Sequence, residues 1–208
     1  MLLKPMKLNL GCADTVVPGW INVDYAIGAR IARLPVLGFL VRRTRLFNLD
    51  WSSDIFIHDL SKVFPWSNES VKYIYCSHTF EHFSREHGRR LLSECYRVLK
   101  PGGIVRIVVP DLAYQVRRYL SNELPAEKFV EELGVLYGLG GSPLKKALSP
   151  FLQFPHKCMY DNHALQRVVR SAGFEVAARA PFDSDIDDIE CIELRRRTEN
   201  AVIIEGIK

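Results

Sequence analysis

The sequence predicts an α/β sandwich built on a mainly parallel sheet, and three observations favour this class. Short segments typical of β-strands alternate with segments of helical periodicity. The stretch 104–109 is nearly all apolar, as expected of a strand covered on both faces. Small or polar residues follow several successive predicted strands, which is where an open parallel sheet binds its ligands.

The individual elements follow from hydrophobic period and from turn residues. We expect a helix over 85–99, where Leu91, Cys95 and Val98 lie on one stripe that Lys100-Pro101-Gly102-Gly103 ends. A second helix begins at Asp161 or Asn162 and closes at Gly173. The segment 13–19 is too short for a full crossover helix and has room for one or two turns. Strands are predicted at 7–10, 20–24, 54–59, 70–76, 104–109, 174–180 and 201–207.

Composition narrows the class of protein. With 48% hydrophobic and 25% charged residues, the chain is typical of globular proteins. A net charge of +4 falls short of the basicity of a nucleic-acid binder, so no nucleic-acid partner is expected. The five cysteines are odd in number and form no C-x-x-C pair, which favours reduced thiols and a cytoplasmic location. The N-terminus does not resemble a signal peptide.

Residues 1–208 are predicted to form a single domain with two insertions, 28–50 and 112–155, that build the substrate side. The first insertion mixes apolar residues with arginines. We expect it to pack on the body as a lid, with transient contact to a membrane surface as the alternative. The apolar stretch 34–41 is too short to span a bilayer, which needs about 20 residues.

The residues that follow the predicted strands have chemical uses. A turn of small residues lets backbone N–H groups approach a ligand. A carboxylate after the second strand can accept both ribose hydroxyls of a nucleoside. A carboxylate after the third can accept an exocyclic amine such as that of adenine. In chain order the residues are Gly11 and Ala13, Asp24, Asp59, Ser77 with His78, and Pro110 with Asp111.

Three groups of motifs resemble one known family. Leu8-Asn9-Leu10-Gly11-Cys12-Ala13 with Gly19-Trp20-Ile21-Asn22-Val23-Asp24 is similar to the first two motifs of the class I S-adenosylmethionine-dependent methyltransferases. Ser77-His78-Thr79-Phe80-Glu81-His82-Phe83, followed by Arg97-Val98-Leu99-Lys100-Pro101-Gly102-Gly103, resembles the middle of that family. His156-Lys157-Cys158-Met159-Tyr160 leading to Ser171-Ala172-Gly173-Phe174 resembles its later part.

This resemblance implies a three-layer sandwich with seven strands, the last of them antiparallel. It also implies that S-adenosylmethionine is the cofactor. The turn formed by Asn9, Gly11, Cys12 and Ala13 would hold its methionine end, Asp24 its ribose, and Asp59 with Leu60 its adenine. Ser77 and His78 would lie beside the methionine moiety or the substrate. The chain departs from the family where Asn9 replaces a frequent acidic residue and Ala13 a second glycine.

Methyl transfer from a sulfonium is an in-line displacement that depends on positioning the nucleophile. A hydroxyl nucleophile also needs a base, and histidine suits that role at neutral pH. We expect a hydroxyl of a small-molecule or glycan-type acceptor. His78 is the first candidate for the base because it follows the fourth strand, and the alternatives are His82, His156, Glu81 and Tyr114.

Other functions are weighed against this one. A non-catalytic nucleoside-binding protein or inactive partner on the same fold is the alternative. A nicotinamide-dependent oxidoreductase is disfavoured because Asp24 comes 13 residues after Gly11, where that motif expects about 20. Cys76, His78 and His82 could be drawn as a metal site, but cysteine in a buried strand is usually a small hydrophobe, so no metal is expected.

Overall fold

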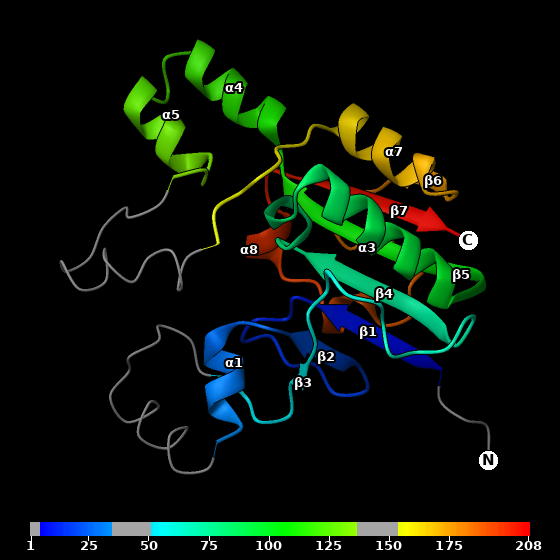
Figure 1. Cartoon of the computed structure of the whole chain (residues 1–208). Coiled ribbons are helices and arrows are strands. Elements are labelled where there is room, and N and C mark those ends of the chain that lie inside the picture. The colour runs from blue at the N-terminus through cyan, green and yellow to red at the C-terminus, as the bar shows by residue number, and fades with distance from the viewer. Residues whose placement is uncertain (1–4, 35–50, 137–153) are drawn as a thin grey trace.

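The computed structural model describes residues 5–34, 51–136 and 154–208 and shows one seven-stranded sheet (Figure 1). The strand order is β3-β2-β1-β4-β5-β7-β6. Strand β7 pairs antiparallel with β5 and β6, and the other pairs are parallel. The predicted fold class is therefore confirmed. The strands are β1 (Met6–Leu10), β2 (Ile21–Asp24), β3 (Phe56–Ile57), β4 (Val71–Ser77), β5 (Leu99–Pro110), β6 (Glu175–Ala178) and β7 (Ala201–Ile207).

The two predicted long helices are present. Helix α3 buries Leu91, Leu92, Cys95 and Val98 toward the sheet. Helix α7 begins after Asp161, whose carboxylate accepts from the amide of Ala164 at 2.7 Å. Within the described residues no helix is long and apolar enough to cross a membrane. The helices are α1 (Ile27–Ala32), η1 (Phe80–His82), α3 (Arg85–Val98), α4 (Leu112–Leu120), α5 (Ala126–Glu132), α7 (Asn162–Ser171), η2 (Ile189–Cys191) and α8 (Arg195–Thr198).

Two strands differ most from their predicted bounds. Strand β3 is confined to Phe56–Ile57 because the Asp59 side chain takes the amide of Ser61 and turns the chain away from the sheet. Strand β5 starts at Leu99, earlier than the predicted residue 104. Helix α3 does end where expected, but the Pro-Gly-Gly turn continues as an irregular strand, since Gly102 donates to the carbonyl of Lys208 at 2.8 Å.

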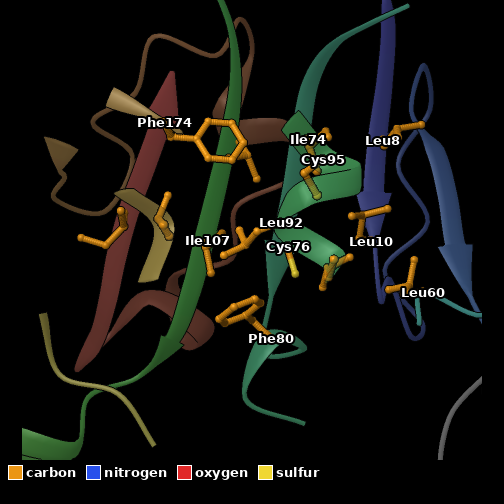
Figure 2. Packing of buried hydrophobic residues seen from close by; sticks show 14 of the residues in the cluster. Leu8, Leu10, Leu60, Ile74, Cys76, Phe80, Leu92, Cys95, Ile107 and Phe174 are labelled. Atoms are coloured by element: carbon orange, nitrogen blue, oxygen red, sulfur yellow. The ribbon is translucent and has the colours of Figure 1, made fainter. Parts of the chain in front are cut away.

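The main hydrophobic core lies between the sheet and helices α3 and α7 (Figure 2). Alternate residues of each strand point into it, as the two-residue period of a strand requires. Its strand members include Leu10, Ile74, Cys76 and Ile107, which meet residues of α3 such as Leu92 and Cys95.

The opposite face of the sheet is covered in a different way. Here Tyr73, Tyr75 and Val108 form a second cluster with Trp20 and with Ile186, Ile189, Ile192 and Ile203. The covering residues Trp20, Ile186, Ile189 and Ile192 come from the loop after β1 and from the segment 180–194, which holds η2. The third layer of the sandwich is thus built here from loops and a single short helical turn.

The connection from β1 to β2 contains turns and no helix, in agreement with its length. Two buried asparagines hold it. The Asn9 amide donates to the carbonyl of Thr15 and to Oδ1 of Asn22, both at 2.9 Å. Asn22 in turn accepts from the amide of Val17 at 3.0 Å and donates to the carbonyls of Val17 and Trp20. Side-chain amides thus satisfy the backbone groups that a crossover helix would otherwise pair.

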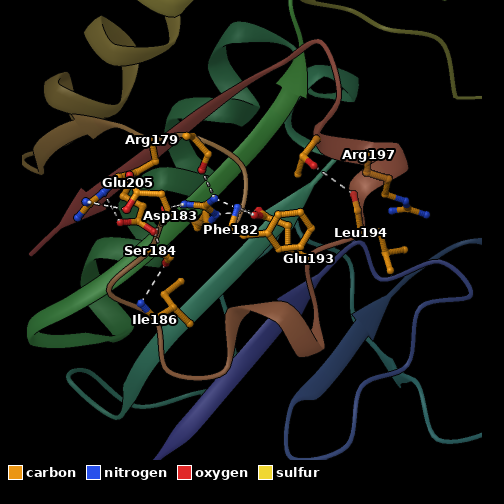
Figure 3. Close-up of polar contacts among 12 residues, drawn as sticks. Arg179, Phe182, Asp183, Ser184, Ile186, Glu193, Leu194, Arg197 and Glu205 are labelled. Atoms are coloured by element: carbon orange, nitrogen blue, oxygen red, sulfur yellow. Dashed lines mark hydrogen bonds and ion pairs between the residues drawn. The ribbon is translucent and has the colours of Figure 1, made fainter.

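An ion network around the buried residues Arg106, Glu193 and Glu205 fastens the segment 180–194 to the sheet (Figure 3). Arg106 of β5 donates to both carboxylate oxygens of Glu193, at 2.8 and 2.9 Å. It also donates to Glu205 of β7 at 2.9 Å, and Arg179 donates to the other oxygen of Glu205 at 2.9 Å. The half-buried Arg179 also pairs with Asp183 and Asp185, so it joins the buried carboxylate of Glu205 to the surface.

We predict that Arg106→Met lowers the free energy of unfolding by about 3–5 kcal/mol, because it leaves Glu193 buried without its guanidinium partner and removes one of the two guanidinium groups that pair with Glu205. Urea denaturation followed by circular dichroism measures the change. Arg196→Met is the matched control, since Arg196 is exposed and its loss should cost less than about 0.5 kcal/mol. Equal stability of the two variants would contradict the role given to Arg106.

Candidate functional site

The carboxyl ends of β1, β2, β3 and β4 lie along one edge of the sheet, and backbone hydrogen bonds connect the residues that follow them. Gly11 donates to the carbonyl of Val23 at 2.8 Å, and His58 donates to that of Asp24 at 3.2 Å. In Figure 1 the arrowheads of β1 and β4 point toward the edge where α8 lies. The structure therefore brings the predicted residues of four strands to one edge.

The turn after β1 requires glycine at position 11 for two reasons. Its φ is +68°, in the left-handed region that favours glycine. A Cβ atom there would lie 2.1 Å from Oγ1 of Thr79, the residue that follows His78. The Thr79 hydroxyl is in turn 3.1 Å from the carbonyl of Ser77. The loop after β4 is thus packed directly on the turn after β1.

Asp24 joins this turn to helix α1. Its Oδ2 accepts from the amide of Ala13 and its Oδ1 from the amide of Ala26, at 2.9 and 2.8 Å. Ala13 adopts a φ of +49°, which aims its N–H at the carboxylate. Each carboxylate oxygen keeps a second lone pair, so Asp24 can still accept hydroxyl groups of a ligand.

Asp59 and Leu60 lie beyond β3. Burial raises the pKa of Asp59, but hydrogen bonds from the hydroxyl and amide of Ser61 outweigh it and hold that pKa below the usual value. Asp59 is therefore a charged acceptor. The Leu60 side chain packs in the main core, which leaves its backbone for any contact with a ligand.

Asn9 and Cys12 turn their side chains away from solvent. Both amide hydrogens of Asn9 are used within the loop it stabilises. The Cys12 thiol packs beside Ala29 and Ile55, and burial raises its pKa to about 12, so that it stays protonated. Only the backbone of Cys12 lies along the turn, where its amide donates to the carbonyl of Val23 at 3.1 Å.

Ser77 and His78 end β4 at the centre of the edge. The Ser77 hydroxyl is buried and has no hydrogen-bond partner among the described residues. His78 has a φ of +49°, and its Nε2 lies 2.8 Å from the carbonyl of Arg197 in α8. Because a carbonyl only accepts, Nε2 carries the proton and Nδ1 keeps its lone pair. Burial lowers the pKa of His78, which favours this neutral form.

Glu81 lies in η1, four residues after Ser77, and is 1% exposed. Neither of its oxygens has a hydrogen-bond partner among the described residues, and burial raises its pKa to about 8. Its Oε1 is 3.8 Å from Nδ1 of His78 and 3.8 Å from Nε2 of His156. A buried carboxyl group thus lies between two imidazoles.

His156 reaches this position from a distant part of the chain. Its Nδ1 donates to the carbonyl of Leu133 at 2.7 Å. Its ring fits against Gly134, where a Cβ atom would come within 2.8 Å of Cε1. The ring of His82 lies 5.0 Å from that of His156, and burial together with His156 lowers the pKa of His82 to about 4.

The structure therefore gathers all three predicted histidines around Glu81. The sequence motif places His78, Glu81 and His82 together, but it holds no signal that His156 returns to them. Tyr114 is positioned on α4, where its ring lies 5.7 Å from the guanidinium carbon of Arg118.

Both predicted insertions are described in part. Residues 35–50, on which most of the predicted lid and membrane contact falls, lie outside the described residues, as do 137–153 of the second insertion. The described start of the first insertion, α1, packs under Trp51: a Cβ atom on Gly28 would lie 2.1 Å from Nε1 of Trp51.

The sheet order and the residues along this edge define a Rossmann-like protein with a site suited to a nucleoside ligand. Residues 40–107 match the model of a family described as methyltransferase domain. This match covers about a third of the chain, which in that segment and in its fold is similar to methyltransferases that depend on S-adenosylmethionine. No curated protein matches the sequence.

Solved structures share the fold at low sequence identity. A methyltransferase from Archaeoglobus fulgidus, dependent on S-adenosylmethionine, is 16% identical with a TM-score of 0.52, over 98% of this chain and 86% of that one. One from Methanosarcina mazei is 16% identical with a TM-score of 0.51, over 99% and 92%. A chain from the complex of the Haloferax volcanii Trm112 methyltransferase activator with a proposed methyltransferase is 16% identical with a TM-score of 0.51, over 100% and 84%.

The residues present at the edge fit S-adenosylmethionine, the cofactor that this similarity implies. Asp24 and Asp59 have carboxylate oxygens that can accept hydroxyl and amine hydrogens, and the buried Ser77 hydroxyl has no partner among the described residues. The Gly11 turn carries no side chain that would keep a ligand from its backbone.

We predict that Gly11→Ala destabilises the fold more than Gly19→Ala. Both residues have positive φ, so each substitution carries a backbone cost of about 1 kcal/mol. An added Cβ meets Thr79 at position 11, whereas nothing lies within 4 Å at position 19. Overpacking should add about 1–3 kcal/mol at position 11. Thermal unfolding of the two variants measures the difference, and equal melting temperatures would show that Thr79 does not press on the turn.

Proposed function

We propose that the protein transfers the methyl group of S-adenosylmethionine to a hydroxyl group of a small-molecule or glycan-type acceptor. The observation that carries this proposal is the packing of Thr79 on Gly11, which holds the loop that contains His78 against the expected cofactor turn. A hydroxyl acceptor has a proton to lose, and a basic ring nitrogen beside the methyl donor meets that need.

In this proposal the chain binds and orients both reactants. The cofactor supplies an electrophilic methyl group on a sulfonium. The backbone of the Gly11 turn and the Ser77 hydroxyl hold its amino-acid end, Asp24 accepts from the ribose hydroxyls, and Asp59 with the backbone of Leu60 meets the adenine. Asn9 and Cys12 contribute by fixing the turn, since their side chains are engaged within the protein.

We assign the role of general base to Nδ1 of His78. The bond from Nε2 to the carbonyl of Arg197 fixes the ring and its tautomer, and leaves Nδ1 with a lone pair for the acceptor proton. His82 and His156 remain alternatives. His156 has the same pair of contacts as His78, to a backbone carbonyl and at 3.8 Å to Glu81, and His78 is preferred because it directly follows β4.

We also propose that one domain, 1–208, carries the activity. Its insertions 28–50 and 112–155 form the substrate side, with 28–50 packed on the body as a lid and transient membrane contact through it as the alternative. The position of His156 supports this, since the end of α5 in the second insertion holds the ring. The free thiols of all five cysteines support the expected cytoplasmic location.

We predict that calorimetry detects binding of S-adenosylmethionine and S-adenosylhomocysteine but not NAD. Asp24→Asn should weaken binding by roughly 10–100-fold, because it removes a charged acceptor of hydrogen bonds. Asp54→Asn, at an exposed aspartate, is the matched control and should bind as the unmodified protein does. Absence of heat with both adenosyl ligands would refute the cofactor assignment. Binding without turnover over a panel of acceptors would favour a non-catalytic nucleoside-binding protein.

We predict that His78→Ala reduces turnover by roughly 10²–10⁴-fold at saturating substrate, because the acceptor proton loses its base. Release of S-adenosylhomocysteine over a panel of hydroxylated acceptors provides the assay. His87→Ala, on the exposed side of α3, should leave the rate unchanged. An unchanged rate in His78→Ala would refute its role as the base.

A further inference from the structure

We propose that Glu81, His82 and His156 form a binding site for one divalent transition-metal ion of the zinc type. Each of the three residues offers one ligand atom, and these atoms lie within 4.8 Å of one another. The set of two imidazole nitrogens and one carboxylate oxygen is common in zinc sites that keep a fourth position open.

The state of Glu81 is the first argument. Its carboxyl group is 1% exposed, and neither oxygen receives a hydrogen bond from the described residues. A buried carboxyl group without a donor is costly, and such groups are normally paired or bound to a metal. Both neighbouring ring nitrogens, Nδ1 of His78 and Nε2 of His156, are free of protons in the tautomers that the backbone carbonyls select. The Glu81 oxygens and these two ring nitrogens are therefore all lone-pair donors, and a cation could bind among them.

The orientation of the histidines is the second argument. A metal-binding histidine usually donates its other ring N–H to a carbonyl or carboxylate, which fixes the ring and directs the ligand nitrogen at the ion. His156 does so through Nδ1 to Leu133 at 2.7 Å. His82 has Nδ1 3.4 Å from the carbonyl of Pro155. In both residues Nε2 is left to bind the ion.

The spacing is the third argument. Nε2 of His156 and Oε1 of Glu81 are 3.8 Å apart, too far for a hydrogen bond of about 2.7–3.2 Å. Two ligands at about 2.0–2.2 Å from a tetrahedral zinc ion are separated by roughly 3.3–3.6 Å. A contraction of a few tenths of an ångström would bring this pair to that separation. Nitrogen-rich donors favour zinc and related ions over Mg²⁺ and Ca²⁺, which prefer oxygen.

The backbone holds the three residues in place. Glu81 and His82 are neighbours in η1, and the Glu81 carbonyl accepts from the amides of Lys157 and Cys158 at 2.8 and 3.1 Å. His156 donates its amide to the carbonyl of Gly134 at 2.9 Å. The site is thus assembled by elements that hold it without a ligand.

The test uses the full-length chain after removal of any affinity tag and of bound metal with a chelator. Titration calorimetry with Zn²⁺ and mass spectrometry of the metal content should show one ion per chain. Glu81→Gln, His82→Ala and His156→Ala should each weaken Zn²⁺ binding at least about 10-fold. His163→Ala is the control for adventitious binding, since His163 is exposed on α7, and its affinity should not change.

Glu81→Gln keeps the shape of the side chain, and circular dichroism with urea denaturation confirms that each variant is folded. Failure of the folded protein to bind Zn²⁺ would overturn the proposal. So would Zn²⁺ binding by Glu81→Gln and His156→Ala that is as tight as binding by the unmodified protein. Metal binding is measured without S-adenosylmethionine or acceptor. A failure of the proposed methyl transfer therefore leaves this result standing, and the reverse also holds.

Discussion

The buried guanidinium of Arg106 is the interaction on which one whole face of the sheet depends. It stands in a strand that is otherwise apolar, and it is fully enclosed by the segment 180–194. With Glu193 it draws that segment over the tyrosines of β4. The chain then passes directly into α8, whose Arg197 carbonyl orients His78. The ion network around Arg106 thereby helps to fix the imidazole ring of His78, although His78 is not part of that network.

At the edge that holds the Gly11 turn, buried polar side chains again fix a loop to the sheet, but here they are uncharged. The Asn9–Asn22 pair stabilises a loop where a crossover helix would otherwise satisfy the backbone. Asp24 then ties the turn to α1 through two amides. Its carboxylate therefore has a structural part as well as its proposed part in binding ribose. An asparagine at this position keeps only one of the two acceptor oxygens and places an NH2 group near the other backbone N–H, so the folding of Asp24→Asn is measured beside its binding.

Local signals account for what the sequence predicts well. The bounds of β7, α3 and α7 follow from hydrophobic period and capping residues, which act within one element. Gly11, Asp24 and Ser77 are found because they directly follow strands. One partner of Arg106 and one partner of Glu81, in contrast, lie far from them in the sequence. Glu193 is 87 positions from Arg106, and His156 meets Glu81 only because the chain returns to η1. Such pairs depend on tertiary packing, and no local pattern encodes them.

The position of the Glu81 cluster bears on the chemistry of the site. Methylation of a hydroxyl requires that the oxygen lose its proton as the new bond forms, the role that we assign to Nδ1 of His78. A bound metal ion lowers the pKa of the oxygen it contacts. Nδ1 of His78 lies 3.8 Å from the same Oε1 that we assign to the ion. An ion at Glu81 would therefore lie beside the proposed base, where the two effects act on one acceptor oxygen.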